Sequence, residues 1–500
     1  MDFFSNLALG LSTALSLSNL FYCFVGVFLG TLLGVIPGIG VLAAISMLFP
    51  LTFHMEATSA LIMLAGIWYG TSYGGSTASI LLNVPGTPAN AVVCLDGYPM
   101  AQQGRGAVAL FMTTMASFVG GSIGIVILTL FAPMIAQYAL SMGSAEYFSL
   151  MLLGLIAATG IADGSAVKGF IMVMLGIFLG SIGTDVYTGT QRFAFGIPEL
   201  SDGISLVALA MGVFGVAELI ISVGSVKANR FKRSDLTLRA MKPTRDDMRR
   251  AWKPMLRGSS IGSFFGALPG TGPSLAAFIA YAVEKRSSRD PSRFGKGAIE
   301  GIMAPESANN AADQTSFIPT LALGIPGSPT MALMLGALII HGITPGPGLM
   351  TEQPSLFWGL IMSFWIGNVL LVILNVPLIG LWVRLLAVPY HLLFPSVLMF
   401  ICLGTYSVNN SAFDVLLVMI FGALGFVMRK LAFPAAPLIL GFVLGPMMED
   451  HFRRAMLLSS GDFATFINRP ISATILSIAA AILIWNGIST LRTHRRLQAS

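Results

Sequence analysis

The chain has 500 residues, of which 55% are hydrophobic and only 10% are charged. An average soluble domain carries about 25% charged residues, so a soluble protein of this size would need far more charge to cover its surface. The formal net charge is +6 and the mean hydropathy is +0.82. These values exclude a cytosolic enzyme and predict an all-α polytopic protein embedded in a lipid bilayer.

The first predicted unit is a membrane repeat over residues 1–226, and it opens with a ladder of glycines. Gly26, Gly30 and Gly34 stand four residues apart, a spacing that lets helix backbones approach closely in a membrane. The ladder leads into Pro37 and Gly38 in the middle of apolar sequence. Proline removes a backbone donor, and an unbroken helix here would exceed the roughly 20 residues of a span. We therefore expect a re-entrant or broken-helix hairpin.

The second unit is a basic loop over residues 227–257. It carries eleven basic and three acidic residues, whereas the other 469 residues carry 17 basic and 19 acidic ones. A basic segment between apolar spans lies on the cytoplasmic side by the positive-inside rule. A loop held at both ends by membrane helices offers little surface to nucleic acid, so we expect no nucleic-acid partner.

The third unit, residues 258–491, is a second membrane repeat that includes a final transmembrane helix. Its ladder of Gly258, Gly262 and Gly266 matches the first ladder at an offset of 232 residues. The segment LLNVPGTP at 81–88 pairs with ALGIPGSP at 322–329 at an offset of 241. Two-fold internal repetition of this kind is typical of secondary transporters. Residues 492–500 are predicted to be a cytoplasmic tail.

Charge indicates that the two repeats are inverted in the membrane. Segment 284–297 carries five basic and two acidic residues, and a hairpin with its tip at Pro269 and Gly270 returns it to the cytoplasm. The matching stretch of the first repeat, residues 51–57, contains no Lys or Arg. We therefore predict that the two hairpins open toward opposite sides.

Each Pro-Gly tip exposes backbone N–H groups at a helix end, where free donors and the helix dipole attract anions. Glycine lets a ligand approach the backbone, and neighbouring hydroxyl groups add donors. We predict that an anionic substrate binds at these tips; the alternative is that the prolines only kink a helix bundle. The predicted substrate-binding residues are Pro37, Gly38, Gly40, Asn83, Pro85, Gly86, Thr87, Pro269, Gly270, Thr271, Gly272, Asn309, Asn310, Pro326, Gly327 and Ser328.

A polar segment at residues 304–317 interrupts the apolar sequence of the second repeat. It holds Glu306 and Asp313 beside Asn309 and Asn310. Hard cations take carboxylate and amide oxygens, and an ionisable group in a membrane is costly to retain. We therefore predict that Glu306 and Asp313 form the ion-coupling site, with Na⁺ or H⁺ as the coupling ion. The alternative is a solvated loop.

Signatures of catalysis are missing. The G-x-S-x-G match at 258–262 opens a membrane segment and lacks a strand–turn–helix context. The five histidines show no metal-ligand spacing, and FGKG at 294–297 lacks the Ser or Thr of a phosphate-binding loop. We predict no catalytic residue, no metal site and no cofactor. A membrane enzyme acting on a lipid-linked or peptide substrate is the alternative.

Several long motifs resemble one transporter family. They are GTLLGVIPGIG, YGGSTASILLNVPGTPANA, GALPGTGPS and FGKGAIEGIMAPESANNAADQTSFIPTLALGIPGSPTMA, and they are similar to the large membrane subunit of the tripartite tricarboxylate transporters, the TctA family. The resemblance runs from about Leu20 to Arg454. Where some relatives have an acidic residue after the first tip, this chain has Thr87, so the exact substrate is not implied.

The resemblance implies a secondary transporter of the inner, cytoplasmic membrane. Such a protein imports tricarboxylates such as citrate, or related organic carboxylates, and is driven by an ion gradient. The resemblance also implies two partners, a small membrane subunit and a periplasmic solute-binding protein.

Overall fold

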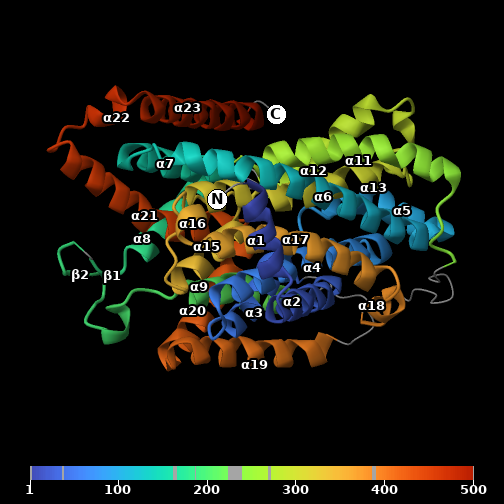
Figure 1. The fold of residues 1–500 in the computed structure, drawn as a ribbon, viewed down its shortest axis with the longest axis horizontal. Helices are drawn as coiled ribbons and strands as arrows, with labels where there is room; N and C mark the ends of the chain where they lie inside the picture. The colour runs from blue at the N-terminus through green and yellow to red at the C-terminus, as the bar shows by residue number, and fades with distance from the viewer. Residues whose placement is uncertain are drawn as a thin grey trace.

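The computed structural model describes residues 3–36, 39–161, 166–185, 187–222, 239–268, 272–385 and 390–498. Helices make up nearly all of this part of the chain, and most of them lie along the long axis of the molecule (Figure 1). The predicted all-α membrane fold is confirmed. Five predicted tip residues, Pro37, Gly38, Pro269, Gly270 and Thr271, lie outside the described residues.

The helices of the first half are α1 (Phe3–Ala14), α2 (Leu17–Val35), α3 (Val41–Leu48), α4 (Ala57–Leu82), α5 (Ala91–Met100), α6 (Gly106–Ala139), α7 (Ser144–Ile161), α8 (Ala166–Gly180), α9 (Leu206–Ala210) and α10 (Ala217–Ser222). Those of the second half are α11 (Arg245–Gly266), α12 (Gly272–Ser287), α13 (Glu300–Thr315), α14 (Phe317–Leu323), α15 (Pro329–Ile340), α16 (Leu349–Glu352), α17 (Pro354–Asn375), α18 (Ile379–Leu385), α19 (Tyr390–Asn409), α20 (Ala412–Lys430), α21 (Ala436–Leu458), α22 (Thr465–Asn468) and α23 (Pro470–Gln498).

Four helical stretches of the described chain are long and apolar enough to cross a membrane. They are Leu17–Val35, Ala91–Ala139, Pro354–Asn375 and Ala412–Lys430. Several shorter apolar helices accompany them, among them α8 and α15. Helices satisfy their own backbone hydrogen bonds, so a bundle of this composition is suited to a bilayer.

Both glycine ladders lie in close helix–helix contacts. At each ladder glycine, an added Cβ atom would overlap a backbone carbonyl oxygen of a neighbouring helix. Between α2 and α4 the pairs are Gly26 with Met63, Gly30 with Ile67, and Gly34 with Thr71; between α11 and α13 they are Gly258 with Ala304, Gly262 with Ala308, and Gly266 with Ala312. The residue numbers rise together in both pairs, so the two helices are parallel. The intervening helix, α3 or α12, must therefore run back between them, as in a hairpin.

The two halves of the chain meet where α4 crosses α13 and the start of α14. Along α4 the contacts are Trp68 with Phe317, Ser72 with Asp313, and Ser76 with Glu306. The numbers fall along one helix as they rise along the other, so α4 and α13 are antiparallel. Because α2 is parallel to α4 and α11 is parallel to α13, the two ladders point in opposite directions. This is the relation that inverted repeats require.

Helix α11 begins inside the segment that was predicted as a loop. The Thr244 hydroxyl accepts a hydrogen bond from the Asp247 N–H at 3.1 Å, and the Asp247 carboxylate accepts one from the Thr244 N–H at 2.9 Å. This capping box starts the helix at Arg245. Arg105 at the start of α6 also donates to Asp247 at 2.7 Å. Burial alone would raise the pKa of Asp247, but the hydrogen bonds from Arg105 and Thr244 outweigh it and lower that pKa.

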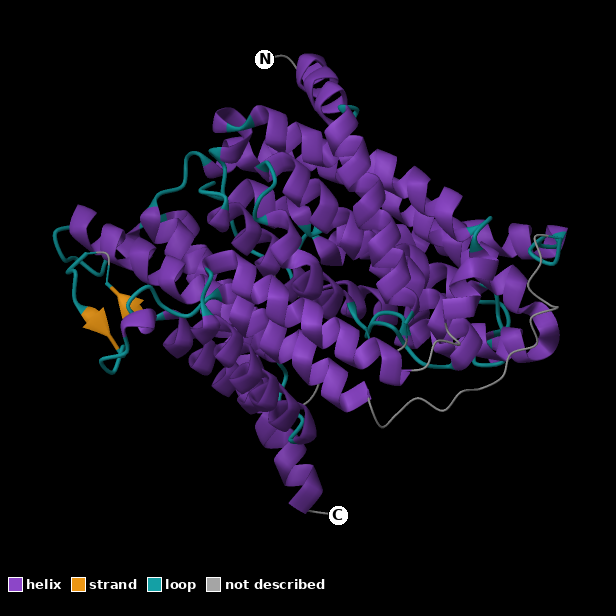
Figure 2. Cartoon of the chain, turned by 90° about the horizontal axis from the view of Figure 1, so that it is seen from below, coloured by secondary structure: helices purple, strands orange, loops and turns teal. Residues whose placement is uncertain are grey.

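The opposite end of the molecule carries a short antiparallel hairpin that was not predicted (Figures 1 and 2). Its strands are β1 (Gly183–Thr184) and β2 (Gln191–Arg192). Arg192 donates to Asp185 in the turn and, at 2.9 Å, to both carboxylate oxygens of Glu449 on α21. A hydrogen bond from the Tyr187 N–H lowers the pKa of Asp185. These ion pairs attach the hairpin to α21.

Candidate functional site

The polar segment of the second repeat forms helix α13, and it is buried rather than solvated. Every residue from Gly301 to Thr315 is buried. Its side chains pack against α11 on one side and against α4 and α6 on the others. The alternative of a solvated loop is therefore wrong. A buried carboxylate must be hydrogen-bonded or paired, since an isolated charge in an apolar interior is very costly.

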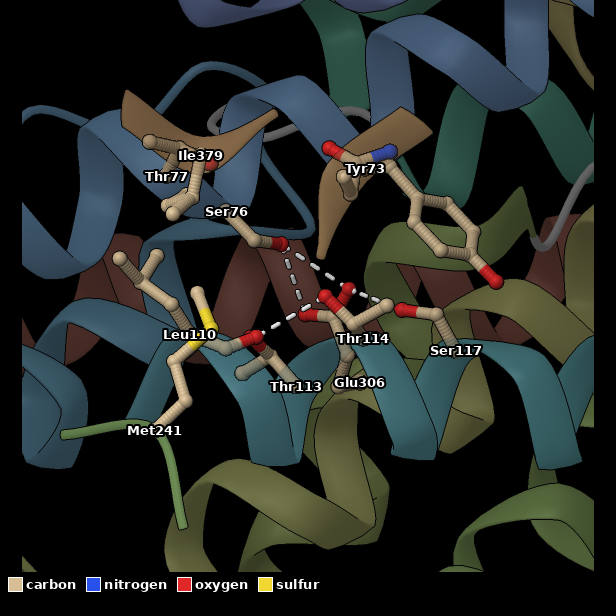
Figure 3. A pocket seen from close by; sticks show the side chains of 11 residues that line it. Tyr73, Ser76, Thr77, Leu110, Thr113, Thr114, Ser117, Met241, Glu306 and Ile379 are labelled. Carbon is tan, nitrogen blue, oxygen red and sulfur yellow. Dashed lines mark hydrogen bonds between the residues drawn. The ribbon is translucent and has the colours of Figure 1, made fainter. Parts of the chain in front are cut away.

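Glu306 is held by hydroxyl groups from two other helices (Figure 3). Ser76 of α4 lies 2.9 Å from both carboxylate oxygens, and Ser117 of α6 donates to Oε1 at 2.7 Å. Asn310 donates to the Ser117 hydroxyl at 2.9 Å and to the Glu306 backbone carbonyl at 3.0 Å. The structure thus brings together the predicted residues Glu306 and Asn310. Ser76 and Ser117 had not been predicted.

Asp313 and Asn309 lie on the same buried helix, but fewer of their side-chain polar atoms have hydrogen-bond partners. Ser72 of α4 donates to Asp313 Oδ2 at 3.1 Å. Within the described part of the chain, Asp313 Oδ1 and Asn309 Nδ2 are buried without a hydrogen-bond partner. Unsatisfied buried polar atoms are uncommon in folded proteins, and a bound water or ion is one explanation for them. Here they leave an acceptor and a donor available to a ligand or an ion.

The tip of the first repeat after α4 lies next to Glu306. Asn83 ends α4 in the left-handed conformation with φ 57°, and Gly86 packs so closely on Gly75 of α4 that an added Cβ would overlap its Cα. Thr87 donates to Asn90 Oδ1 at 2.6 Å, and Asn90 Nδ2 donates to the Ser76 hydroxyl at 2.8 Å. Gly86 and Thr87 are buried, whereas Asn83 and Pro85 are exposed. Gly40, at the start of α3, lies against the same tip, with its Cβ position 3.4 Å from the Gly86 carbonyl oxygen.

The second tip has the same local geometry at the 241-residue offset. Gly324 ends α14 with φ 70°, as Asn83 ends α4, and Ser328 caps α15 by accepting a hydrogen bond from the Met331 N–H at 3.3 Å. Pro326, Gly327 and Ser328 are all buried. In the described residues no hydrogen bond engages the N–H groups of Gly86, Thr87, Gly327 or Ser328. Gly272, which begins α12 with φ 67°, has no atom within 4 Å of its Cβ position.

A small cavity borders Glu306. Its volume is about 10 Å³, which suffices for a single water molecule. The hydroxyl groups of Ser76, Thr77, Thr113, Thr114 and Ser117 line it beside Glu306, and Leu110, Met241 and Ile379 form its apolar wall (Figure 3). The cavity is too small for an organic carboxylate, so such an anion could enter only after a change of conformation.

A much larger cleft, of about 920 Å³, lies near the hairpin end of the molecule and was not predicted. Four acidic side chains line it, those of Glu199, Asp202, Asp414 and Asp450, and none of its described lining residues is basic. Its negative charge disfavours an anion. The cleft is therefore not the candidate site for an anionic substrate.

The fold and the site together define a class of protein. Buried carboxylates of α13 lie where the two halves of a polytopic α-helical protein meet, close to a helix break, and ionisable groups in such places commonly mark ion pathways of membrane transporters. The chain belongs to the tripartite tricarboxylate transporter TctA family, whose model matches residues 20–440. It is thus a component of a multi-pass membrane transporter and not an enzyme, and the tripartite family implies further subunits.

Two similar proteins, both from Agrobacterium vitis, cover much of the chain. The uncharacterized 52.8 kDa protein in the TAR-I ttuC' 3' region is 49% identical over 497 residues, which is 99% of this chain and 98% of that protein. The uncharacterized protein in the TAR-II ttuC' 3' region is 54% identical over 234 residues, which is 47% of this chain and 97% of that protein. No solved structure matches this chain.

Proposed function

We propose that the protein imports a tricarboxylate or a related organic carboxylate across the inner membrane, coupled to a gradient of Na⁺ or H⁺. In this proposal a periplasmic solute-binding protein delivers the anion, and a small membrane subunit completes the complex. The family assignment supports the proposal, because the chain is a component of a tricarboxylate transporter.

The observation that carries the proposal is the contact between the two halves at Glu306. A carboxylate of the second repeat is held by Ser76 of the first repeat, one short link from the Gly86–Thr87 tip. A cation or proton bound at Glu306 would change the hydrogen bonds of both halves at once. Ionisable residues inside membranes commonly mark ion pathways and proton relays.

The anion is proposed to bind through backbone N–H groups of the tips. Those of Gly86, Thr87, Gly327 and Ser328 have no partner within the described chain. A helix-terminus interaction contributes about 0.3–1 kcal/mol when exposed and up to about 2 kcal/mol when partly buried, so several must converge. Weak, shared binding suits a transporter, because it must also release its substrate.

Opposed repeats are also what alternating access needs. The antiparallel contact of α4 with α13 supports two inverted units, each with two tips, that move against each other around a central site. Asn309 and Asp313 belong to the same central stretch of α13 and have free polar atoms. We assign them, with Asn310, to this site.

Uptake assays test the proposal. Proteoliposomes containing the chain, the small membrane subunit and the binding protein should accumulate labelled citrate, or another carboxylate of a small panel, faster when an inward Na⁺ or H⁺ gradient is imposed. Equal uptake with and without every gradient would contradict the coupling. No uptake of any carboxylate would contradict the substrate class.

A further inference from the structure

One side chain, that of Asn90, joins the Gly86–Thr87 tip to the carboxylate of Glu306. The Thr87 hydroxyl donates to Asn90 Oδ1 at 2.6 Å, and Asn90 Nδ2 donates to the Ser76 hydroxyl at 2.8 Å. The Ser76 hydroxyl in turn lies 2.9 Å from both oxygens of Glu306. Three consecutive hydrogen bonds therefore connect the place proposed for the anion with the place proposed for the ion.

The Asn90 carboxamide has little freedom to move. Asn90 has no exposed surface, and an added Cβ at Gly75 would lie 2.6 Å from its Oδ1, so the amide packs directly on the α4 backbone. The Asn90 N–H donates to Thr87 Oγ1 at 3.2 Å. The Thr87 hydroxyl is thus an acceptor from the backbone, and its own hydrogen points to Asn90 Oδ1. A movement of Thr87 or Ser76 must therefore also move the opposite end of the Asn90 amide.

The second repeat has no equivalent link. At the 241-residue offset that relates the two tips, Met331 corresponds to Asn90 and Phe317 corresponds to Ser76. Neither side chain can relay a strong hydrogen bond. The link is therefore particular to the first tip and is not a by-product of the repeat.

We propose that Asn90 is a positioning residue that couples anion binding at the Gly86–Thr87 tip to ion occupancy of Glu306, an inference that rests on the function proposed above. A cation or proton on Glu306 competes with Ser76 for the carboxylate oxygens. The Ser76 hydroxyl then turns, which changes the acceptor that it offers to Asn90 and so moves Thr87. Anion binding should change the affinity of Glu306 for the ion through the same hydrogen bonds, because coupling between two binding sites is reciprocal.

The test measures coupling rather than activity alone. Proteoliposomes of the full complex are assayed with the carboxylate that the wild type takes up fastest from citrate, isocitrate and malate, at low and at high coupling ion. The readout is the ratio of the two KM values, and couplings between sites are typically roughly 5–150-fold. Asn90→Ala should bring this ratio to about 1 while uptake at saturating carboxylate and ion persists.

A second variant and a matched control complete the test. Ser76→Ala should also bring the ratio of the two KM values to about 1. The double variant should show the same ratio as either single variant, because both substitutions break the same chain of hydrogen bonds. Asn19→Ala is the control. Asn19 is another buried amide, which donates to the Thr13 carbonyl and accepts from Ser59; its variant should keep the wild-type ratio.

The possible results separate the two proposals. A wild-type ratio in Asn90→Ala, whatever the ratio in Ser76→Ala, overturns the role of Asn90 but leaves the transporter function standing. An equal loss in Asn19→Ala overturns it too, because any buried amide would then have the same effect. A wild type without ion dependence contradicts the proposed function itself. If Asn90→Ala does not reach the membrane, Thr87→Val decides, because it removes the donor to Asn90 Oδ1 at the other end of the link and leaves the hydrogen bonds of Glu306 in place. A wild-type ratio in Thr87→Val would overturn the role of Asn90.

Discussion

Glu306 and Asp313 lie two turns apart on α13, and both face α4, but their surroundings differ. Glu306 accepts from Ser76 and Ser117, whereas Asp313 accepts from Ser72 and keeps one oxygen without a partner in the described chain. A carboxylate surrounded by hydroxyl groups can exchange a donor for a proton or a cation. Glu306, which also borders a cavity, is therefore the stronger candidate for the coupling ion.

Glu306→Gln should remove the ion dependence of uptake. The amide keeps the size of the side chain but cannot be charged, and its NH₂ group would face hydroxyl donors. We expect the stimulation of uptake by the ion gradient to fall by roughly 5–150-fold, the size of a typical coupling. Glu300→Gln is the control, because Glu300 is on the same helix and pairs with Arg250 and Arg293. Unchanged ion dependence in both Glu306→Gln and Asp313→Asn would assign α13 a structural role only.

The two tip glycines should respond differently to alanine. At Gly86 a Cβ would overlap the Gly75 backbone, so Gly86→Ala should cost about 1–3 kcal/mol of stability. At Gly327 the nearest atom is Pro319 Cγ at 3.3 Å, which can yield, so Gly327→Ala should fold normally but take up substrate with a raised KM. Thermal unfolding in detergent and uptake kinetics measure these effects. Equal destabilisation by the two variants would contradict the described packing.

Residue types and spacing predicted Glu306, Asp313 and the tips, because charged and Pro-Gly residues are conspicuous in apolar sequence. The sequence did not predict the roles of Ser76, Ser117 and Asn90. Single hydroxyl and amide side chains are common in membrane helices, and nothing in their local sequence says which of them meet a carboxylate. That follows only from the antiparallel crossing of α4 with α13, a contact between residues some 230 positions apart.

At the scale of elements, the start of α11 depends on Asp247. Its pKa is lowered on folding, so its carboxylate contributes stability that is fully present above the unfolded pKa of about 3.9 and is lost as the pH falls through the lower folded value. Asp247→Asn should weaken the first turn by on the order of 1 kcal/mol at neutral pH. The difference from the wild type should shrink below about pH 3.9.

Hydrogen exchange of the amides of residues 245–250 measures this effect. Asp246→Asn is the matched control, because Asp246 is exposed and, among the described residues, forms an ion pair only with Arg250. Equal changes in both variants, or a difference that grows toward acid pH, would contradict the capping role of Asp247.

The sequence predicted the helical class of the fold and the close packing at the glycine ladders, but not every element. The glycine ladders predicted close helix packing, which α2 with α4 and α11 with α13 display. The helical start at Arg245 was not predicted, because the positive-inside rule assigns a basic segment to one side of the membrane and does not distinguish a loop from a helix that begins with a Thr-x-x-Asp capping box. The β1–β2 hairpin was missed because two-residue strands leave no alternating pattern, and ion pairs with α21 hold it.

For the whole molecule, the basic segment and the β hairpin should face opposite sides of the membrane. The described start of α11, from Arg245 onward, and the hairpin lie toward opposite ends of the long axis (Figure 1). In a cysteine-free background, Thr188→Cys in the hairpin turn should react with a membrane-impermeant maleimide in intact cells. Arg249→Cys should react only after permeabilisation. Both positions are exposed, so the reverse pattern would overturn the orientation.

In the proposed mechanism the anion binds between the tips, beside Glu306, where the two halves of the chain meet. A cryo-EM structure of the complex with bound citrate, or with whichever carboxylate it transports, tests this most directly. We expect carboxylate density against the N–H groups of Gly86 and Thr87 or of Gly327 and Ser328, with the cavity beside Glu306 enlarged. Density in the acidic cleft near Asp202 and Asp450, with the tips empty, would contradict it.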